Sequence, residues 1–299
     1  MPLVPMSQIL KDAQKKGYAV GYFESWDYGS LKVSLRAAEE SWSPVIIGFG
    51  GRTFLQDSSW DEVKLTGFAV MGRELIKNSR VPTAFILNEV SDTELIKRAM
   101  RLGFNCVMFD GSSLTLEDNI GSTREIVNQA TKLRIDVEGQ VGRIPSWKER
   151  INRDFLTDPE AAAYFVRQTG VNALAISVGN IHMLTHKEFS VDLQRLEKIN
   201  KLVSVPLVMH GGTGFPDKLI KKVINKGVYK FNVGTILKKV FLEELRKNLT
   251  QKDLARINPQ ELIDSTTEKD ILKKAYLSVK KMIKAKLEAY GSAGEVKTL

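Results

Sequence analysis

The chain has 299 residues, of which 43% are hydrophobic and 26% charged, so its composition excludes a disordered, collagen-like or coiled-coil protein. Lysine and arginine number 44 against 35 acidic residues, and this net charge of +9 favours anionic partners in general: phosphorylated metabolites, nucleic acid or acidic surfaces. No stretch approaches the roughly 20 uncharged apolar residues of a membrane span, and no signal-peptide pattern opens the chain. The single cysteine, Cys106, excludes internal disulfides. We therefore predict a cytoplasmic protein without a membrane partner.

A helical pattern over residues 6–16 comes first in the chain, and a series of short apolar runs rich in β-branched residues follows it. Each run precedes an amphipathic stretch with helical spacing. Continuous apolarity, rather than alternation, is typical of strands that are covered on both faces. The predicted strands are residues 19–23, 45–49, 83–87, 106–109, 134–137, 173–178, 207–209 and 228–233.

The stretches between these runs carry helix boundary signals. Apolar residues over 92–102 form one helical stripe, Asp92 can cap its start, and Gly103 stands where a C-terminal cap glycine belongs. Residues 218–226 repeat the scheme, and Asp158-Pro159 marks the start of another helix. We therefore predict helices between the strands.

Eight strand–helix units without a flexible linker indicate a closed (β/α)8 TIM barrel, an α/β fold. We predict one domain over residues 1–299, with the barrel at about 17–250 and a helical extension at about 251–299. This extension would hold a helix from about Asp253 and another over 270–290. A doubly wound open sheet is the alternative, but no GxGxxG motif follows the first strand.

Candidate ligands stand at the ends of the predicted strands, where barrels carry their catalytic groups. Two of the three histidines, His182 and His210, follow neighbouring strands, and carboxylates follow others. Histidines with one carboxylate form a familiar zinc shell that leaves a position open for substrate. We therefore predict a shared divalent metal, whereas His186 is interpreted as a surface residue.

A glycine-rich turn after the seventh strand, Gly211-Gly212-Thr213-Gly214, opens a helix. Glycines let backbone N–H groups approach an anion, and a helix N-terminus adds favourable potential. Residues 232–235 also stand at a helix start. Together the two segments predict a phosphate site, an arrangement that recurs after strands seven and eight of barrels. No motif for nucleic-acid binding is present.

These motifs, in this order and spacing, resemble the class II, metal-dependent ketose-bisphosphate aldolases, the family of fructose-bisphosphate and tagatose-bisphosphate aldolases. The resemblance runs from about Met6 to about Glu244. The matching segments are Ala37-Ala38-Glu39-Glu40, Ser43-Pro44-Val45-Ile46, Gly103-Phe104, Val107-Met108-Phe109-Asp110-Gly111-Ser112, Val137-Glu138, Gly142-Arg143-Ile144, Leu156-Thr157-Asp158-Pro159, Gly179-Asn180-Ile181-His182, His210-Gly211-Gly212-Thr213-Gly214 and Asn232-Val233.

The resemblance implies a TIM barrel, a catalytic zinc, a phosphorylated sugar as substrate, and a homodimer or homotetramer. It makes His182 and His210 zinc ligands, and it makes Asp110 and Glu138 candidates for a second metal or for an acid. The residues expected to bind substrate or phosphate are Gly179, Gly211, Gly212, Thr213, Asn232, Val233, Gly234 and Thr235.

The chain departs from the family at the predicted active site. The family's catalytic aspartate is Asn88, and its first zinc histidine is Glu89. The second glutamate in the family's Glu-x-Glu of the fifth strand is Gln140, the glycine after the sixth-strand histidine is Met183, and the aspartate of Asn-Ile-Asp-Thr is Gly234. We therefore expect an altered pocket, and the sugar need not be fructose 1,6-bisphosphate.

Asn88 and Glu89 decide the predicted chemistry. Aldol cleavage needs a base for the hydroxyl proton beside the breaking bond and a Lewis acid for the enediolate. An amide cannot titrate, so Asn88 can orient a hydroxyl but cannot take its proton. Three roles stay open for Glu89: it completes a His2Glu zinc shell, which would make the metal a weaker electrophile, it serves as the missing base, or it does neither.

Other residues remain candidates for the base. Glu24 and Asp27 lie just beyond the first strand, and each is either a base or an ordinary loop acid. Lys230 lies in the eighth strand, where a Schiff-base lysine would stand in another class of aldolase.

Three functions follow from the sequence. The first is a metal-dependent aldolase that cleaves or forms a carbon–carbon bond in a phosphorylated ketose. The second is an isomerase or epimerase that enolises a phosphorylated sugar. The third is a barrel that binds such a sugar without catalysis, which the replacement of the catalytic aspartate by Asn88 would allow.

Overall fold

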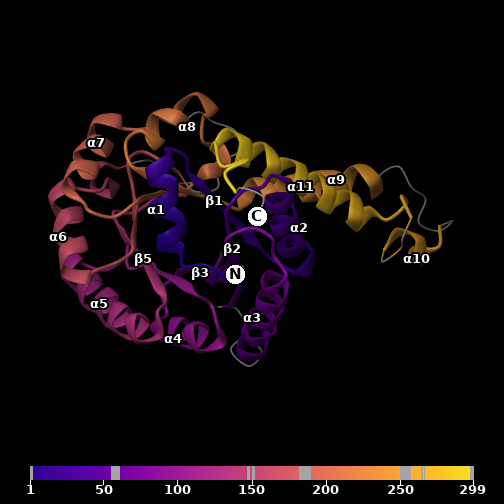
Figure 1. Cartoon of the computed structure of the whole chain (residues 1–299), viewed down its shortest axis with the longest axis horizontal. Helices are drawn as coiled ribbons and strands as arrows, with labels where there is room; N and C mark the ends of the chain where they lie inside the picture. Colours follow the sequence, from indigo (N-terminus) through magenta and orange to yellow (C-terminus); the bar gives the residue numbers. More distant parts are fainter. Residues whose placement is uncertain are drawn as a thin grey trace.

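The structure is a computed structural model of the whole chain, drawn in Figure 1. It describes residues 3–54, 61–146, 149, 152–181, 190–249, 257–263, 265 and 267–296. Four features of the sequence analysis lie outside the described residues: His182, Met183, His186 and the start of a helix near Asp253.

Eight parallel strands close into one barrel in the order β1-β2-β3-β4-β5-β6-β7-β8. This topology confirms the predicted TIM barrel, and the alternative of an open doubly wound sheet is wrong. The strands are β1 (Val20–Ser25), β2 (Val45–Gly50), β3 (Thr83–Val90), β4 (Cys106–Phe109), β5 (Asp136–Val141), β6 (Ala173–Ile176), β7 (Leu207–Met209) and β8 (Val228–Val233).

Helices surround the barrel, as Figure 1 shows, and the described loops contain three short 3-10 helices. The helices are α1 (Met6–Lys16), α2 (Tyr28–Glu40), α3 (Asp61–Lys77), α4 (Thr93–Leu102), α5 (Leu116–Leu133), α6 (Pro159–Thr169), α7 (Leu193–Leu202), α8 (Asp217–Ile224), α9 (Thr235–Leu249), α10 (Pro259–Leu262) and α11 (Ile271–Ala289), and the 3-10 helices are η1 (Gly51–Phe54), η2 (Arg153–Phe155) and η3 (Gly212–Gly214).

Alternate residues of each strand face opposite sides of the barrel wall. Outward side chains pack beneath the helices in one large apolar cluster. Inward side chains such as Tyr22, Ile86 and Met108 form a second cluster, which also contains Met6 and Leu10 from α1. Helix α1 therefore closes the end of the barrel where the strands begin, and it lies across the barrel in Figure 1.

The predicted helix signals are confirmed. Asp92 caps α4 through the N–H groups of Glu94 and Leu95, and Gly103 ends that helix with a φ of 98°. Asp158 caps α6 ahead of Pro159. The predicted fifth strand began too early: β5 starts at Asp136 because Arg134 adopts a left-handed conformation (φ 58°) and ends α5.

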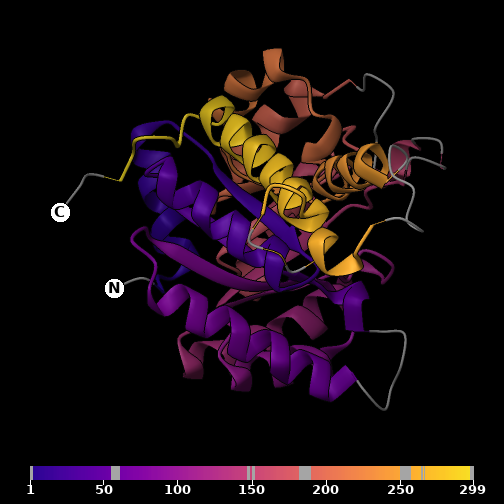
Figure 2. The ribbon, with the colours of Figure 1, turned by 90° about the vertical axis from the view of Figure 1, so that its right-hand side faces the viewer.

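Helices α9 and α11 pack side by side and reach beyond the barrel, with α10 near their tip (Figures 1 and 2). Trp26, just after β1, contacts Phe241 of α9 with ring centroids 5.4 Å apart. Phe241 in turn contacts Tyr276 of α11, whose hydroxyl donates to Asp27 at 2.6 Å. These contacts join the projecting helices, which we call the C-terminal arm (α9–α11), to the loop between β1 and α2.

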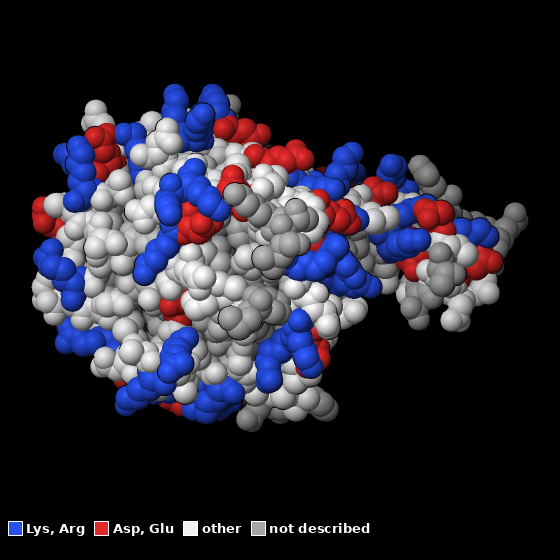
Figure 3. Space-filling model, in the orientation of Figure 1, with Lys and Arg blue, Asp and Glu red and all other residues white. Residues whose placement is uncertain are grey.

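Lysine side chains of the late helices lie at the surface, interspersed with acidic ones (Figure 3). Lys280 and Lys284 of α11 both pair with Glu40 of α2, at 2.7 and 3.3 Å. Both lysine side chains are partly exposed, so this face of α11 is solvated. Within the described residues, no helix is long and apolar enough to cross a membrane.

Candidate active site

His210 lies at the centre of the buried polar groups at the mouth of the barrel, directly after β7. Its Nδ1 is 2.9 Å from Oε1 of Glu89, and its Nε2 is 3.1 Å from Oε1 of Glu138. The Asn232 amide nitrogen is 2.8 Å from the same Nε2. Burial alone would lower the pKa of His210, but the hydrogen bonds and charges of Glu138 and Glu89 raise it to about 9. Without a metal, the imidazole therefore carries a charge at neutral pH.

A buried ion pair between Glu138 and Lys230 lies next to His210. Glu138 of β5 and Lys230 of β8 are both fully buried, and Nζ of Lys230 donates to Oε2 of Glu138 at 2.7 Å. The same Nζ donates to Oδ1 of Asn232 at 2.7 Å and lies 5.0 Å from the centre of the Tyr22 ring. Burial alone would raise the pKa of Glu138, but Lys230 and His210 outweigh it and lower that pKa. Glu138 is thus a charged acceptor that orients His210.

This ion pair bears on two of the predictions. The amine of Lys230, a candidate Schiff-base residue, donates hydrogen bonds to Glu138 and Asn232 and is not free to attack a carbonyl. Glu138 was considered as a second-metal ligand or an acid, and it contacts His210 and Lys230. This pairing was not predicted from the sequence. A lysine at an inward position of an apolar strand does indicate a buried ion pair, because lysine is almost never fully buried unless it is paired.

Glu89 stands on strained backbone. Its φ is 54°, in the left-handed region, and the register between β3 and β4 shifts between Leu87 and Val90. A residue other than glycine seldom adopts this conformation, and such strain often occurs at functional sites. Consecutive strand residues normally point to opposite faces, and the irregularity lets Glu89 reach His210 while Asn88 remains buried in β3.

Asn88 is 2% exposed, and its Oδ1 has no hydrogen-bond partner among the described residues. It is the register partner of Gly50 in β2. A buried carbonyl oxygen without a donor is costly in a folded protein. The Oδ1 atom of Asn88 can therefore accept a hydrogen bond from a bound ligand.

The predicted phosphate segments lie against each other. The hydroxyl of Thr213 accepts a hydrogen bond from the backbone N–H of Ile236, in the first turn of α9, at 3.2 Å. Gly211 has a φ of 78°, and a Cβ there would stand 2.3 Å from the Ile181 carbonyl oxygen. Gly212 packs against the Asn232 carbonyl, and a Cβ on it would be 2.8 Å from that oxygen. The turn thus requires glycine, and it brings backbone N–H groups beside a helix N-terminus.

The remaining predicted substrate residues frame this turn. Gly179 follows β6 with a φ of 101°, and a Cβ there would stand 2.3 Å from the Ser190 carbonyl oxygen. Val233 ends β8, Gly234 comes next, and Thr235 begins α9. The side chain of the neighbouring Asn180 donates to the His210 carbonyl oxygen at 3.1 Å and so ties the sixth unit to the seventh.

Two predicted acids are not brought to His210. Asp110 follows β4 and accepts the backbone N–H of Ser112 at 3.1 Å. Asp27 caps α2, with Oδ1 accepting from the Ser30 N–H and Oδ2 from the Tyr276 hydroxyl. Asp27 is therefore a structural residue rather than a base.

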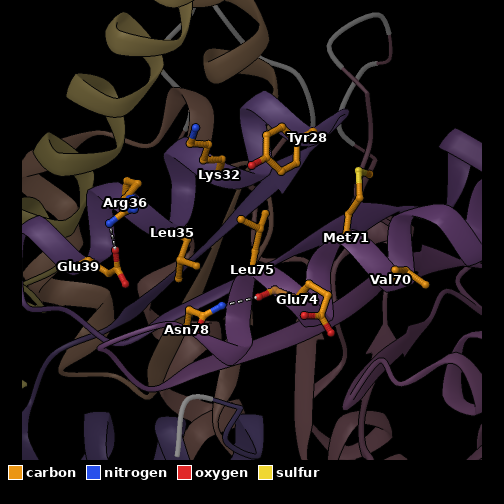
Figure 4. Close-up of a pocket in the computed structure, with 10 residues that line it drawn as sticks. All are labelled: Tyr28, Lys32, Leu35, Arg36, Glu39, Val70, Met71, Glu74, Leu75 and Asn78. Atoms are coloured by element: carbon orange, nitrogen blue, oxygen red, sulfur yellow. Dashed lines mark hydrogen bonds and ion pairs between the residues drawn. The ribbon is translucent and has the colours of Figure 1, made fainter.

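A second concavity lies outside the barrel, between α2 and α3 (Figure 4). It has a volume of about 640 Å³, and its lining includes Tyr28, Lys32 and Met71. Arg36 pairs with Glu39 along its wall at 3.1 Å. None of the predicted site residues lines it.

The prediction of a bound metal depends on two described donor side chains at the mouth of the barrel, Glu89 and His210. Glu89 Oε1 and His210 Nδ1 are 2.9 Å apart, close to the spacing of about 3.3 Å that two ligands of a tetrahedral zinc would have. The other ring nitrogen of His210 faces a carboxylate, which is the usual environment of a metal-binding histidine. The third predicted ligand, His182, lies outside the described residues, and no group of three metal-binding side chains is found within them. The two donors that are described fit a zinc ion.

A closed parallel barrel with a histidine, carboxylates and a glycine-rich turn at one mouth is typical of a TIM-barrel enzyme. A family model described as fructose-bisphosphate aldolase class-II matches residues 4–295. The chain belongs to this family: it is a class-II aldolase and therefore a lyase.

Similar proteins agree with this assignment. The chain is 33% identical to a sulfofructosephosphate aldolase of Alkalicoccus urumqiensis, over 83% of this chain and 86% of that protein. It is 30% identical to a fructose-bisphosphate aldolase of Staphylococcus aureus, over 99% of this chain and 100% of the other. The crystal structure of the YdjI aldolase from Escherichia coli K12 superposes with a TM-score of 0.81 at 29% identity, covering 99% of this chain and 100% of that one.

Proposed function

We propose that this aldolase cleaves and forms a carbon–carbon bond in a phosphorylated ketose with the aid of a zinc ion or a similar divalent cation. The main support is His210, which is held between Glu89 and Glu138 beside the glycine-rich turn. The phosphorylated substrates named for the relatives in Alkalicoccus urumqiensis and Staphylococcus aureus also support it.

The metal would be held by Glu89, His210 and His182. When bound there, zinc would supply a Lewis acid that polarises the ketose carbonyl and stabilises the enediolate. The protein's own groups prepare this site: Glu138 orients the imidazole of His210, and Lys230 keeps Glu138 charged. We assign Glu89 to the metal rather than to proton transfer because its Oε1 lies 2.9 Å from Nδ1 of His210, close enough for both atoms to bind one ion.

The other predicted residues would bind the substrate. The backbone of Gly211 to Thr213 and the start of α9 would hold the phosphate, because their N–H groups gather at one place. Asn88 would orient a sugar hydroxyl through its unpartnered Oδ1. We propose Asp110 as a polar contact at the edge of the mouth.

Removal of the metal tests this function. We expect the purified protein to contain about one zinc per chain and to release a triose from fructose 1-phosphate, fructose 1,6-bisphosphate or tagatose 1,6-bisphosphate. Exhaustive chelation should abolish this cleavage, and added Zn²⁺ should restore it. Cleavage that survives chelation would remove the metal from the mechanism. A rearranged sugar in place of a triose would favour an isomerase or epimerase.

We also propose that the protein is a homodimer or homotetramer that assembles through the C-terminal arm. The arm carries large apolar side chains that face solvent: Leu242 is 61% exposed, Ile263 51% and Leu277 44%. We expect light scattering to give a mass of two or four chains, and Leu242→Asp to lower it to that of one. Leu133→Asp on α5, where leucine is 52% exposed, is the matched control and should leave the mass unchanged. A monomeric wild type would refute the assembly.

A cytoplasmic location remains part of the proposal. It is supported by the single thiol, Cys106, which is buried in the barrel rather than bridged.

A further inference from the structure

Glu24 occupies an unusual place at the mouth of the barrel. It lies on β1 two residues after Tyr22, so both side chains face the interior. On each side of Glu24, a glycine at or just after the end of the neighbouring strand, β2 or β8, lies next to the Glu24 side chain. A Cβ on Gly50, at the end of β2, would lie 3.2 Å from Glu24 Oε1, and a Cβ on Gly234, after β8, would lie 2.3 Å from Glu24 Oε2. The carboxylate of Glu24 thus fills space that both neighbours leave open.

The two oxygens of Glu24 have different surroundings. Oε1 accepts from Nζ of Lys238, in the first turns of α9, at 2.6 Å. Oε2 has no donor among the described residues, and the side chain is 26% exposed. The carboxylate is therefore anchored by one oxygen and open at the other, which points along the wall towards Gly234.

Glu24 belongs to the same polar site as the residues already described. Burial raises the pKa of the Tyr22 hydroxyl, and the charges of Glu24, Glu89 and Glu138 raise it further, so all three carboxylates act on this one hydroxyl. Gly50 is the register partner of Asn88, the residue whose amide cannot take a proton. Because Gly50 has no side chain, no side chain of β2 stands between Glu24 on β1 and Asn88 on β3 at this level.

The other acids near the mouth are already engaged. Both oxygens of Asp27 accept hydrogen bonds that cap α2 and hold Tyr276. Glu89 faces His210, and Glu138 is buried between His210 and Lys230. Asp110 accepts a backbone N–H in its own loop.

We propose that Glu24 is the general base of the cleavage reaction and acts in place of the carboxylate that Asn88 lacks. This inference rests on the proposed function. Oε2 takes the proton of the hydroxyl on the carbon that becomes the aldehyde, which is one of the two carbons of the breaking bond. The O–H electron pair forms the carbonyl of the aldehyde product. The carbon–carbon bond breaks, and its electron pair leaves with the other half of the ketose as an enediolate, which then takes a proton from solvent.

The test compares Glu24→Gln and Glu24→Ala with the wild type on the sugar of the three-ketose panel that the wild type cleaves. We expect Glu24→Gln to lower kcat by about 100-fold or more, while KM and the bound zinc stay close to wild type. Added formate should restore the kcat of Glu24→Ala by about tenfold, because it can stand where the carboxylate stood.

Two further variants separate a catalytic from a structural role. Gly234→Ala should lower kcat because its Cβ displaces the carboxylate, and the loss should be smaller in Glu24→Ala, where no carboxylate is left to displace. Glu197→Ala, which removes a surface carboxylate paired with Lys226, should keep its kcat and show no response to formate. A wild-type kcat in Glu24→Gln, or no rescue of Glu24→Ala by formate, would overturn the assignment. A wild type that cleaves none of the three sugars would instead contradict the proposed function.

Discussion

Replacing Glu89 with glutamine is expected to release most of the bound zinc and to lower kcat/KM for cleavage by about 10³-fold, equivalent to about 4 kcal/mol of transition-state stabilisation. The amide is a poor zinc ligand, and it removes the negative charge that faces Nδ1 of His210. Metal analysis and steady-state kinetics on the same preparation measure both effects.

Glu89→His is the informative companion to this variant. Histidine tolerates the left-handed conformation at position 89 better than most residues, and its neutral imidazole can bind zinc. We expect Glu89→His to retain the metal. Glu94→Gln, at an exposed carboxylate of α4, is the matched control and should keep both zinc and turnover. Full zinc content with lost turnover in Glu89→Gln would make Glu89 a base instead of a ligand.

Replacing Lys230 with methionine is expected to lower the free energy of unfolding by about 3–5 kcal/mol, because it leaves the charge of Glu138 buried beside an apolar side chain. Denaturant unfolding of the metal-free protein measures this change as a lower midpoint. In the double variant Lys230→Met/Glu138→Gln, much of the loss should be recovered, since no unpaired charge remains.

The matched control is Lys226→Met, which breaks a pair with Glu197 at the surface. Exposed ion pairs contribute little, so its cost should stay below about 1 kcal/mol. Equal costs for the two lysine variants would contradict a special role for the buried pair.

The fold was largely predictable because its main signals are local. Strands covered on both faces produce runs such as Val45 to Phe49, and the caps at Asp92 and Asp158 depend on residues within one turn of the chain. The start of β5 was predicted wrongly because the left-handed conformation of Arg134 depends on how α5 ends rather than on hydrophobicity.

The site was predictable in part. The place of His210 after β7 follows from strand order, but its contacts with Glu89 and Glu138 depend on the stagger of the barrel, which no local pattern contains. For the same reason the pairing of Lys230 with Glu138, 92 residues apart, was not anticipated. The positive φ of Glu89 and the space around Glu24 are likewise visible only in three dimensions. The role of His182 stays a prediction.

The hydrogen bond from Tyr276 to Asp27 spans 249 positions of the chain. It links the last long helix to the first strand–helix unit, and β8 completes the ring by pairing with β1. During synthesis the N-terminal units therefore emerge well before the partners that complete them, and closing such long loops is slow. The catalytic mouth, which draws on β1 and β8 together, can therefore form only after β8 has left the ribosome.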